Sequence, residues 1–143
     1  MNLMDTYEIF KDFLDEIEVH YTEDKLESGD RFFRIPQKLK NGGVVNIIVI
    51  FGEKNIKVLV VGIATIEDEA KKVECLKLFS ELNAQYNFFK VYMRSNGDVN
   101  IDGDVVVGVF GGEFQPRALM GFMIAALNYT QDVYGDVMKI QWA

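Results

Sequence analysis

Polar side chains that could bind a metal ion recur at every second position between residues 98 and 104. They are Asp98, Asn100, Asp102 and Asp104. Together with Gly103 they match the opening of a calcium-binding EF-hand loop, D-x-[DN]-x-[DN]-G. Such a loop also needs a bidentate carboxylate at its twelfth position, which is Val109 here. Because alternate residues of a β-strand share a face, we instead expect an amphipathic strand and no calcium site.

Histidine and cysteine chemistry is limited, because the chain has one of each, His20 and Cys75. One chain therefore cannot supply a full set of Cys and His ligands to zinc, or form an internal disulfide. His20 has no nucleophile elbow nearby, so we expect a surface side chain. A Cys75 nucleophile with His20 as its base stays open on the sequence alone. We expect Cys75 to be a buried or half-buried small apolar residue.

Motifs for nucleotide chemistry are missing from the sequence. Neither G-x-x-x-x-G-K-[ST] nor a G-x-G-x-x-G that opens a helix occurs. Carboxylates are abundant, but sequence position does not say whether two of them share a cleft. We therefore predict a protein that is not an enzyme and that needs no cofactor or metal. An enzyme is retained only as the third hypothesis.

Composition narrows the possible partners. The chain has 143 residues, which suits one domain spanning residues 1–143. Its net charge of −7 opposes nucleic-acid backbones and anionic membranes. The longest uncharged apolar run, Ala118–Leu127, is shorter than the ~20 residues of a membrane span, and the N-terminus has no signal-peptide pattern. We expect a cytoplasmic protein, whose acidity serves solubility or attracts a partner with basic segments.

The first third of the chain predicts one helix and short strands. Apolar residues recur at helical spacing over Leu3–Ile17, with charged residues on the opposite side. A short strand is possible at Val19–Thr22, and Arg31–Ile35 is a second candidate strand. Pro36 indicates that this strand ends there or lies at a sheet edge.

Two long strands, Val44–Phe51 and Ile56–Ile66, follow the turn signal Asn41-Gly42-Gly43. In both strands apolar residues occupy the two faces. The first strand has Val45, Ile47, Val49 and Phe51 on one face and Ile48 and Ile50 on the other. The second has Ile56, Val58 and Val60 on one face and Leu59, Val61 and Ile63 on the other. An antiparallel sheet with one wet face alternates cleanly, so we expect a helix or another subunit over the second face.

A second helix is expected from the capping box Thr65–Asp68 to about Tyr86. Its apolar residues are Val73, Leu76, Phe79 and Leu82, which we expect to be buried, while Cys75 and Leu78 begin another row. Because these residues form more than one row, we expect some of them to point outward.

A hairpin and a third helix complete the chain. Strands Phe88–Arg94 and Val99–Val109 are joined at Asn96-Gly97, which predicts a type I′ turn. Gly111-Gly112 then breaks the chain. The last helix is expected from Pro116 to about Tyr134, with Gly135 as its C-terminal stop. The tail after Gly135 would either dock or form a last strand.

The last helix is apolar all round between residues 118 and 127, which predicts burial on several sides. Gly121 and Ala125 would permit close backbone approach. Met120 and Met123 are adaptable packers of the kind found at surfaces that accept varied partners. A central core helix and an interface are both compatible with this pattern.

The second half of the chain contains a set of short motifs: Leu82-Asn83, Phe88–Tyr92, Asn96–Val99, and Gly111-Gly112 before a helix with Leu119. The resemblance that these motifs carry is to the YbjN-like family of sensory-transduction-regulator domains. It covers residues 65–134, while the first half agrees in element order. One departure is Gln115, where a Ser or Thr helix cap is expected before Pro116.

The resemblance implies the fold of the small acidic type III secretion chaperones. We therefore expect an α+β protein with an antiparallel sheet of about five strands, in the order α-β-β-β-α-β-β-α. The family implies a non-enzymatic homodimer that binds another protein or a peptide segment, chaperone-like or regulatory. The secretion chaperones pair partly through the helix after the third strand, so the resemblance implies that the helix ending near Tyr86 contributes to the dimer surface. A small-ligand sensor with a pocket between sheet and helix is the alternative. The candidate interaction residues are Val73, Leu76, Phe79, Met120 and Met123.

Overall fold

The computed structural model describes residues 3–106 and 113–143. In these residues three helices accompany an antiparallel sheet of six strands, ordered β1-β2-β3-β4-β6-β5. In chain order the elements are α1 (Leu3–Glu16), β1 (Thr22–Lys25), β2 (Arg31–Lys38), β3 (Val44–Phe51), β4 (Asn55–Thr65), α2 (Glu69–Gln85), β5 (Lys90–Met93), β6 (Asp98–Val106) and α3 (Pro116–Gln141). The expected break at Gly111-Gly112 and the expected strand end at Val109 lie outside the described residues.

The predicted fold class is confirmed, with one strand more than expected. The first strand lies at Thr22–Lys25, further along the chain than the predicted Val19–Thr22. β2 also continues through Pro36 to Lys38. Its pairing with β1 ends at Arg34, so β2 is a local edge beyond that residue. A proline at an edge removes no ladder hydrogen bond, which is why the strand can continue.

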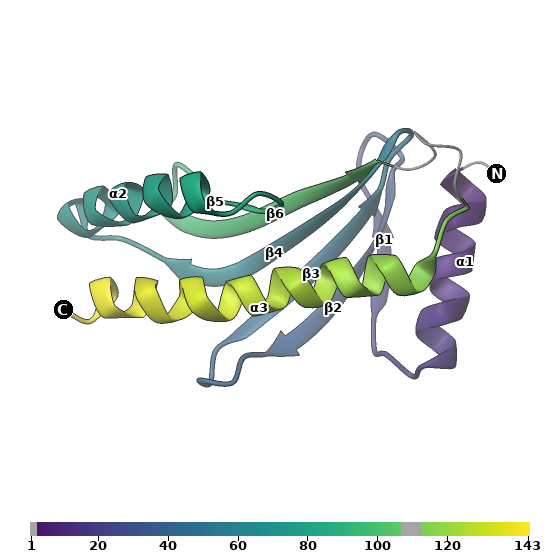
Figure 1. Cartoon of the computed structure of the whole chain (residues 1–143), viewed down its shortest axis with the longest axis horizontal. Helices are drawn as coiled ribbons and strands as arrows, with labels where there is room; N and C mark the ends of the chain where they lie inside the picture. Colours follow the sequence, from purple (N-terminus) through teal and green to yellow (C-terminus); the bar gives the residue numbers. More distant parts are fainter. Residues whose placement is uncertain (1–2, 107–112) are drawn as a thin grey trace.

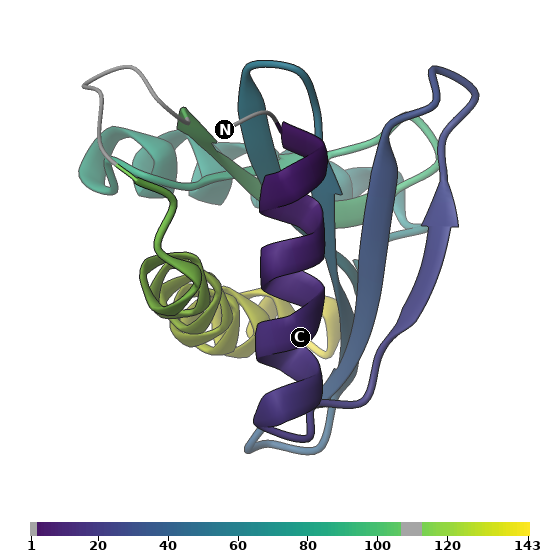
Figure 2. The same cartoon turned by 90° about the vertical axis from the view of Figure 1, so that its right-hand side faces the viewer.

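All three helices lie against one face of the sheet, which we call the covered face (Figures 1 and 2). The helices contribute these fully buried or nearly buried side chains: Tyr7, Phe10, Leu14, Cys75, Phe79, Leu119, Met123, Ala126, Tyr129, Val133 and Val137. The strands contribute alternate residues, among them Phe33, Ile47, Val49, Val58 and Ile101. The expectation that Cys75 is a buried apolar residue is confirmed.

The helix α3 is longer than predicted and runs along the whole sheet (Figure 1). The predicted stop at Gly135 and separate tail are wrong, because the helix continues to Gln141. Gly135 is not in the left-handed conformation of a helix stop. Val133 and Val137, on either side of it, are fully buried. Their burial offsets the cost of about 1 kcal/mol for a glycine in a helix.

Burial of α3 on several sides is also wrong, because one side of the helix faces solvent. Gly121, Ile124, Ala125 and Asn128 are exposed. A Cβ atom placed on Gly121 would meet nothing within 4 Å, so this glycine serves no close approach within the described residues. The helix does begin at Pro116, and Gln115 makes no side-chain capping bond.

The cap of α2 differs from the predicted capping box. Asp68 is the N-cap, and its Oδ1 accepts a hydrogen bond from the Lys71 N–H at 3.0 Å. Thr65 ends β4 instead, where its hydroxyl donates to Asp98 across the sheet at 2.7 Å. The predicted end near Tyr86 is confirmed, since Tyr86 is the C-cap.

The hairpin between β5 and β6 is present, but the predicted type I′ turn is wrong. Gly97 has a φ of 93°, whereas Asn96 does not share a positive φ. The Gly97 N–H donates to the Arg94 carbonyl, and the Arg94 N–H donates to the Asp98 carbonyl. This is the three-residue loop in which a type I turn precedes a left-handed glycine.

Candidate protein-binding surfaces

A small apolar groove lies between α3 and the strands β2 and β3. Its volume is about 120 Å³. The lining residues are Met120, Met123, Ile124 and Leu127 from α3, Ile35, Gln37 and Ile47 from the sheet, and Val19 from the connection after α1. Gln37 is its one polar side chain. We call this feature the α3 groove.

The α3 groove contains two of the five predicted interaction residues. Met123 is buried at 3% exposure, and Met120 is half-buried. The neighbouring Ile124, which sequence reasoning missed, is 51% exposed at the rim. Its only sequence signal was membership of the apolar run. A groove with a buried thioether and an exposed aliphatic rim can accept one apolar side chain.

The other three predicted residues lie on α2 and are not brought into the groove. Phe79 is buried at 3% exposure, so it is not available to a partner. Val73 and Leu76 are each 53% exposed, which corrects the expectation that they are buried. The buried row of α2 is instead Cys75 and Phe79. Val73 and Leu76 form a separate apolar surface on the solvent side of α2.

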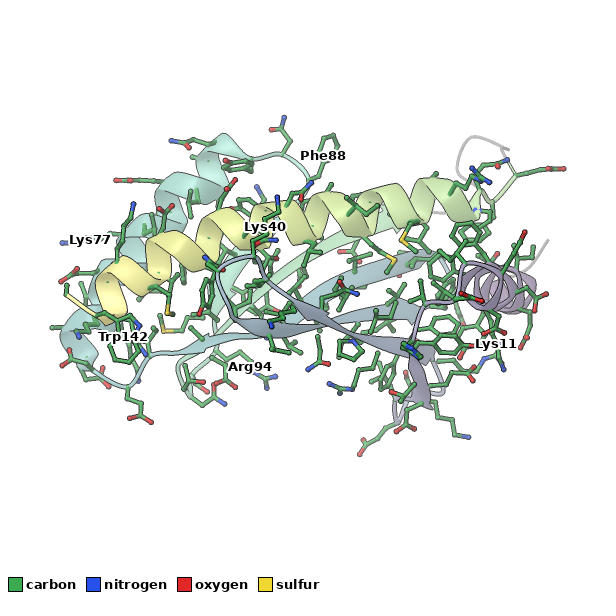
Figure 3. All side chains as sticks on the ribbon, turned by 90° about the horizontal axis from the view of Figure 1, so that it is seen from below. Lys11, Lys40, Lys77, Phe88, Arg94 and Trp142 are labelled. Atoms are coloured by element: carbon green, nitrogen blue, oxygen red, sulfur yellow. The ribbon has the colours of Figure 1, made fainter. Side chains whose placement is uncertain are left out.

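The second face of the sheet, which we call the open face, is not covered by any helix of the described residues (Figure 3). The expectation that a helix covers this face is therefore wrong. Cover by a second subunit stays a prediction. The apolar side chains of the open face are Phe32, Ile48, Ile50, Leu59 and Val61. Ile48 is 7% exposed, and the other four are half-buried. Ile63, expected in this row, is buried instead beside the bulge of β4.

The polar residues of β6 border the open face. The predicted alternation is confirmed: Val99 and Ile101 are buried in the core, and the intervening polar residues face the other way. Lys57 Nζ lies 3.2 Å from Asp104 and 3.7 Å from Asp102. Burial alone would lower the pKa of Lys57, but the two carboxylates outweigh it and the pKa is raised. These acids therefore already have partners within the protein.

The described residues give little support for a metal-binding site. Asp98 accepts hydrogen bonds from Thr65 and Asn96. No group of three or more His, Cys, Asp or Glu side chains among residues 3–106 and 113–143 is placed to hold a metal ion. His20 is exposed, as predicted. The absence of a calcium site stays a prediction.

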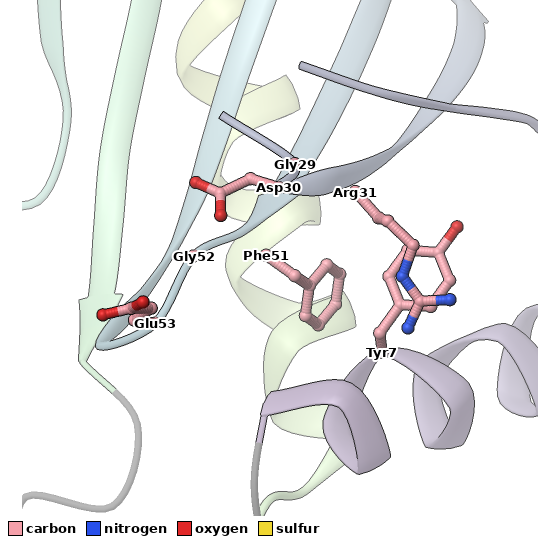
Figure 4. Close-up of a pocket in the computed structure, with 7 residues that line it drawn as sticks. All are labelled: Tyr7, Gly29, Asp30, Arg31, Phe51, Gly52 and Glu53. Atoms are coloured by element: carbon pink, nitrogen blue, oxygen red, sulfur yellow. The ribbon is translucent and has the colours of Figure 1, made fainter. Parts of the chain in front are cut away.

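A pocket of about 160 Å³ lies where α1 meets the ends of β2 and β3 (Figure 4). The Arg31 guanidinium carbon sits 3.8 Å from the Tyr7 ring centroid, and Arg31 also pairs with Glu8 at 3.1 Å. The Tyr7 hydroxyl donates to Glu23 at 2.6 Å. Burial, reinforced by Glu23, raises the pKa of Tyr7. These contacts attach α1 to the sheet, which explains the shift without a catalytic role.

Both edges of the sheet are protected against pairing with another strand. β1 has four residues, three of them charged. At the other edge, the Val91 N–H donates to Asn83 Oδ1 at 2.8 Å, and Asn83 Nδ2 donates to the Val91 carbonyl at 2.9 Å. Asn83 thus occupies the backbone groups that a further strand would need. A partner is better accommodated on a face or in a groove than at these edges.

These features define a class of protein: an α+β fold of the YbjN type, with helices on one face of an antiparallel sheet. No protein-family model matches the chain, and a search of curated proteins finds no match. Among solved structures, the chain is similar to YbjN from E. coli, a protein described as a candidate transcription regulator. The TM-score is 0.67 at 13% identity, over 96% of this chain and 93% of that one.

The predicted YbjN-like fold is therefore confirmed. At this level of identity the likeness concerns the fold alone. Among the described residues, no helix is both long enough and apolar enough to cross a bilayer.

Proposed function

We propose that the protein is a non-enzymatic protein-binding module, chaperone-like or regulatory, that acts as a cytoplasmic homodimer. The observation that carries the proposal is the α3 groove, an apolar depression with an exposed aliphatic rim in a YbjN-like fold. The regulator description of YbjN is consistent with this role. The charge of −7 favours a partner whose flanking segments are basic.

The size of the α3 groove supports the binding of a polypeptide side chain over that of a small ligand at this position. Sites for small organic ligands occupy ~300–1,000 Å³. The α3 groove, at about 120 Å³, is well below that range. A cavity of roughly 150 Å³ holds one benzene molecule. The α3 groove therefore suits a single Leu, Met or Phe side chain presented by a polypeptide better than a small organic ligand.

The test uses lysine-flanked fluorescent peptides with Leu, Met or Phe at the centre, measured by fluorescence anisotropy. We expect saturable binding that is lost when the central residue is Ser. Ile124→Asp, at the groove rim, should weaken binding at least tenfold, because it places a charge where an apolar side chain docks.

Val73→Asp is the matched control, because Val73 on α2 is β-branched and almost equally exposed. It should leave the affinity unchanged. Loss of binding in Val73→Asp, with Ile124→Asp unaffected, would move the site to the α2 surface. A tightly held small molecule in native mass spectra, released by Ile124→Asp, would favour the ligand-sensor alternative.

A further inference from the structure

One cross-strand row of the open face carries opposite charges on β2 and β6. The row runs Arg34, Ile48, Leu59 and Asp102 across β2, β3, β4 and β6. Its order is positive, apolar, apolar and negative. The midpoint of the row lies between β3 and β4. The half with Arg34 and Ile48 is complementary to the half with Leu59 and Asp102.

The two charged ends of this row differ in how well they are neutralised. Among the described residues, Arg34 makes no ion pair and no side-chain hydrogen bond. At the other end, Asp102 and Asp104 share the single ammonium of Lys57. Asp104 also accepts a hydrogen bond from Asn55, so Asp102, 3.7 Å from Lys57, is the more weakly paired of the two carboxylates. Within the described residues Arg34 is therefore an unpaired cation, and Asp102 has acceptor capacity left for a further donor.

We propose that a second copy of this chain covers the open face, related by a two-fold axis parallel to the strands between β3 and β4. The inference rests on the homodimer proposed above and assigns its surface. In this arrangement β2 lies over β6 of the second copy. Arg34 faces Asp102 of the second copy, and Ile48 faces Leu59 of the second copy. The contact is isologous, so the Arg34–Asp102 salt bridge and the Ile48–Leu59 contact each form twice.

The charge pattern selects this axis over the other face-to-face arrangement. A two-fold axis across the strands would place β2 over β2 and bring Arg34 of both copies together. Like charges brought face to face disfavour that arrangement. Aligned sheets pack about 10 Å apart with their strands within roughly 30°, which Ile48, Ile50, Leu59 and Val61 can fill.

The area of the open face sets the expected strength of the dimer. Four strands spaced about 4.8 Å apart, each about eight residues long at ~3.3 Å per residue, present on the order of 500 Å² per copy. The total of about 1,000 Å² is at the lower limit for a specific interface. The dimer should therefore dissociate on dilution, with a Kd in the micromolar range.

The experiment is light scattering after gel filtration, from about 1 to 300 µM, on the full chain and four variants. The wild type should reach twice the 16.3 kDa monomer mass at high concentration. Arg34→Glu and Asp102→Arg should each raise the Kd at least tenfold, since each brings like charges together. The double variant should restore dimerisation, because the pair is exchanged in both copies. Lys77→Glu, an exposed charge reversal on α2, is the control and should dimerise normally.

Two results would overturn the inference in distinguishable ways. A wild type that dimerises while Arg34→Glu and Asp102→Arg dimerise equally well would place the interface elsewhere and leave the homodimer intact. A monomeric wild type at every concentration would remove the homodimer itself. Peptide binding in the α3 groove is measured separately and survives either result. Circular dichroism spectra matching the wild type exclude misfolding as the cause of a monomeric variant.

Discussion

Two neighbouring phenylalanines in β2 show how differently the two faces of the sheet are built. Phe33 is fully buried on the covered face, where its ring stacks on Tyr7 at 4.4 Å and meets Tyr21 and Phe51 edge-on. Phe32, on the open face, is half-buried, and no ring of the described residues is placed against it. Its cross-strand neighbours are Asp24 and Ile50.

The two faces of the sheet differ in the side chains that cover them. The covered face buries side chains from every helix in one core, so it holds the fold together. The open face is apolar in its centre and charged at its sides, which is the anatomy of a protein interface. Residues of the same type therefore have different roles on the two faces. Folding depends on the covered face, and the proposed dimerisation would depend on the open face.

Alanine substitution of the two phenylalanines should give the largest difference. Phe33→Ala should lower the free energy of unfolding by about 3–5 kcal/mol, because it removes a buried ring and leaves a cavity. Phe32→Ala should cost no more than about 1 kcal/mol in dilute, monomeric protein. Urea denaturation at about 1 µM measures both. Equal losses would show that the faces do not differ as described.

Gly103 and Asp104 are adjacent in β6 and give a second comparison of the covered face with the open face. A Cβ atom on Gly103 would lie 2.6 Å from the Phe88 carbonyl oxygen and 2.8 Å from the Phe89 ring. Gly103→Ala should therefore cost about 1–3 kcal/mol through overpacking. Asp104→Ala loses an exposed ion pair with Lys57 and an exposed hydrogen bond from Asn55, together about 1 kcal/mol. Thermal unfolding should rank the variants in this order, and the reverse order would contradict the packing.

The attachment of α1 to the covered face should depend on pH. The hydrogen bond from Tyr7, opposed in part by burial, lowers the pKa of Glu23. The contribution of Glu23 to stability is therefore complete above the pKa of roughly 4.3 that a glutamate has in the unfolded chain. It is lost as the pH falls through the lower pKa of Glu23 in the folded protein. Because Glu23 is partly exposed, the effect is at most about 1 kcal/mol.

The difference in unfolding free energy between the wild type and Glu23→Gln measures this effect. It should be largest near pH 7 and shrink below pH 4, where both side chains are neutral. The matched variant Glu53→Gln, an exposed carboxylate on the turn after β3, should show no such change. A difference that grows on acidification would contradict the assignment.

Calcium should have the smallest effect of all, namely none. The polar row of β6 is engaged by Lys57, Thr65 and Asn96 rather than arranged as a loop. Titration calorimetry with millimolar calcium should show no saturable heat. A binding isotherm that disappears in Asp98→Ala would make the open face a metal site instead of a protein interface.

The elements predictable from sequence were those specified by local periodicity. The amphipathic pattern of α1 and the polar alternation of β6 each depend on side chains a few residues apart. Two local signals failed because distant residues override them. Thr65 is engaged by Asp98 across the sheet, which leaves the cap of α2 to Asp68. Gly135 stays helical because Val133 and Val137 are held in the core.

The candidate surfaces were predictable only in part. Met120 and Met123 were identified as adaptable apolar residues, and both line the α3 groove. Val19 and Gln37 join them from other elements, which only the tertiary structure brings together. The doubled apolar rows of β3 and β4 predict that both sheet faces are shielded, which stays a prediction for the open face. They do not indicate that every helix packs on the same face.

The most direct test of the account is the exposure of the open-face methyl groups at two protein concentrations. Solvent paramagnetic relaxation of the Ile48, Ile50 and Leu59 methyls can be measured by NMR at about 50 µM and 1 mM. The account predicts that these methyls become protected at the higher concentration, while the exposed Ile124 methyls do not change. Open-face methyls that stay equally accessible at both concentrations would contradict it.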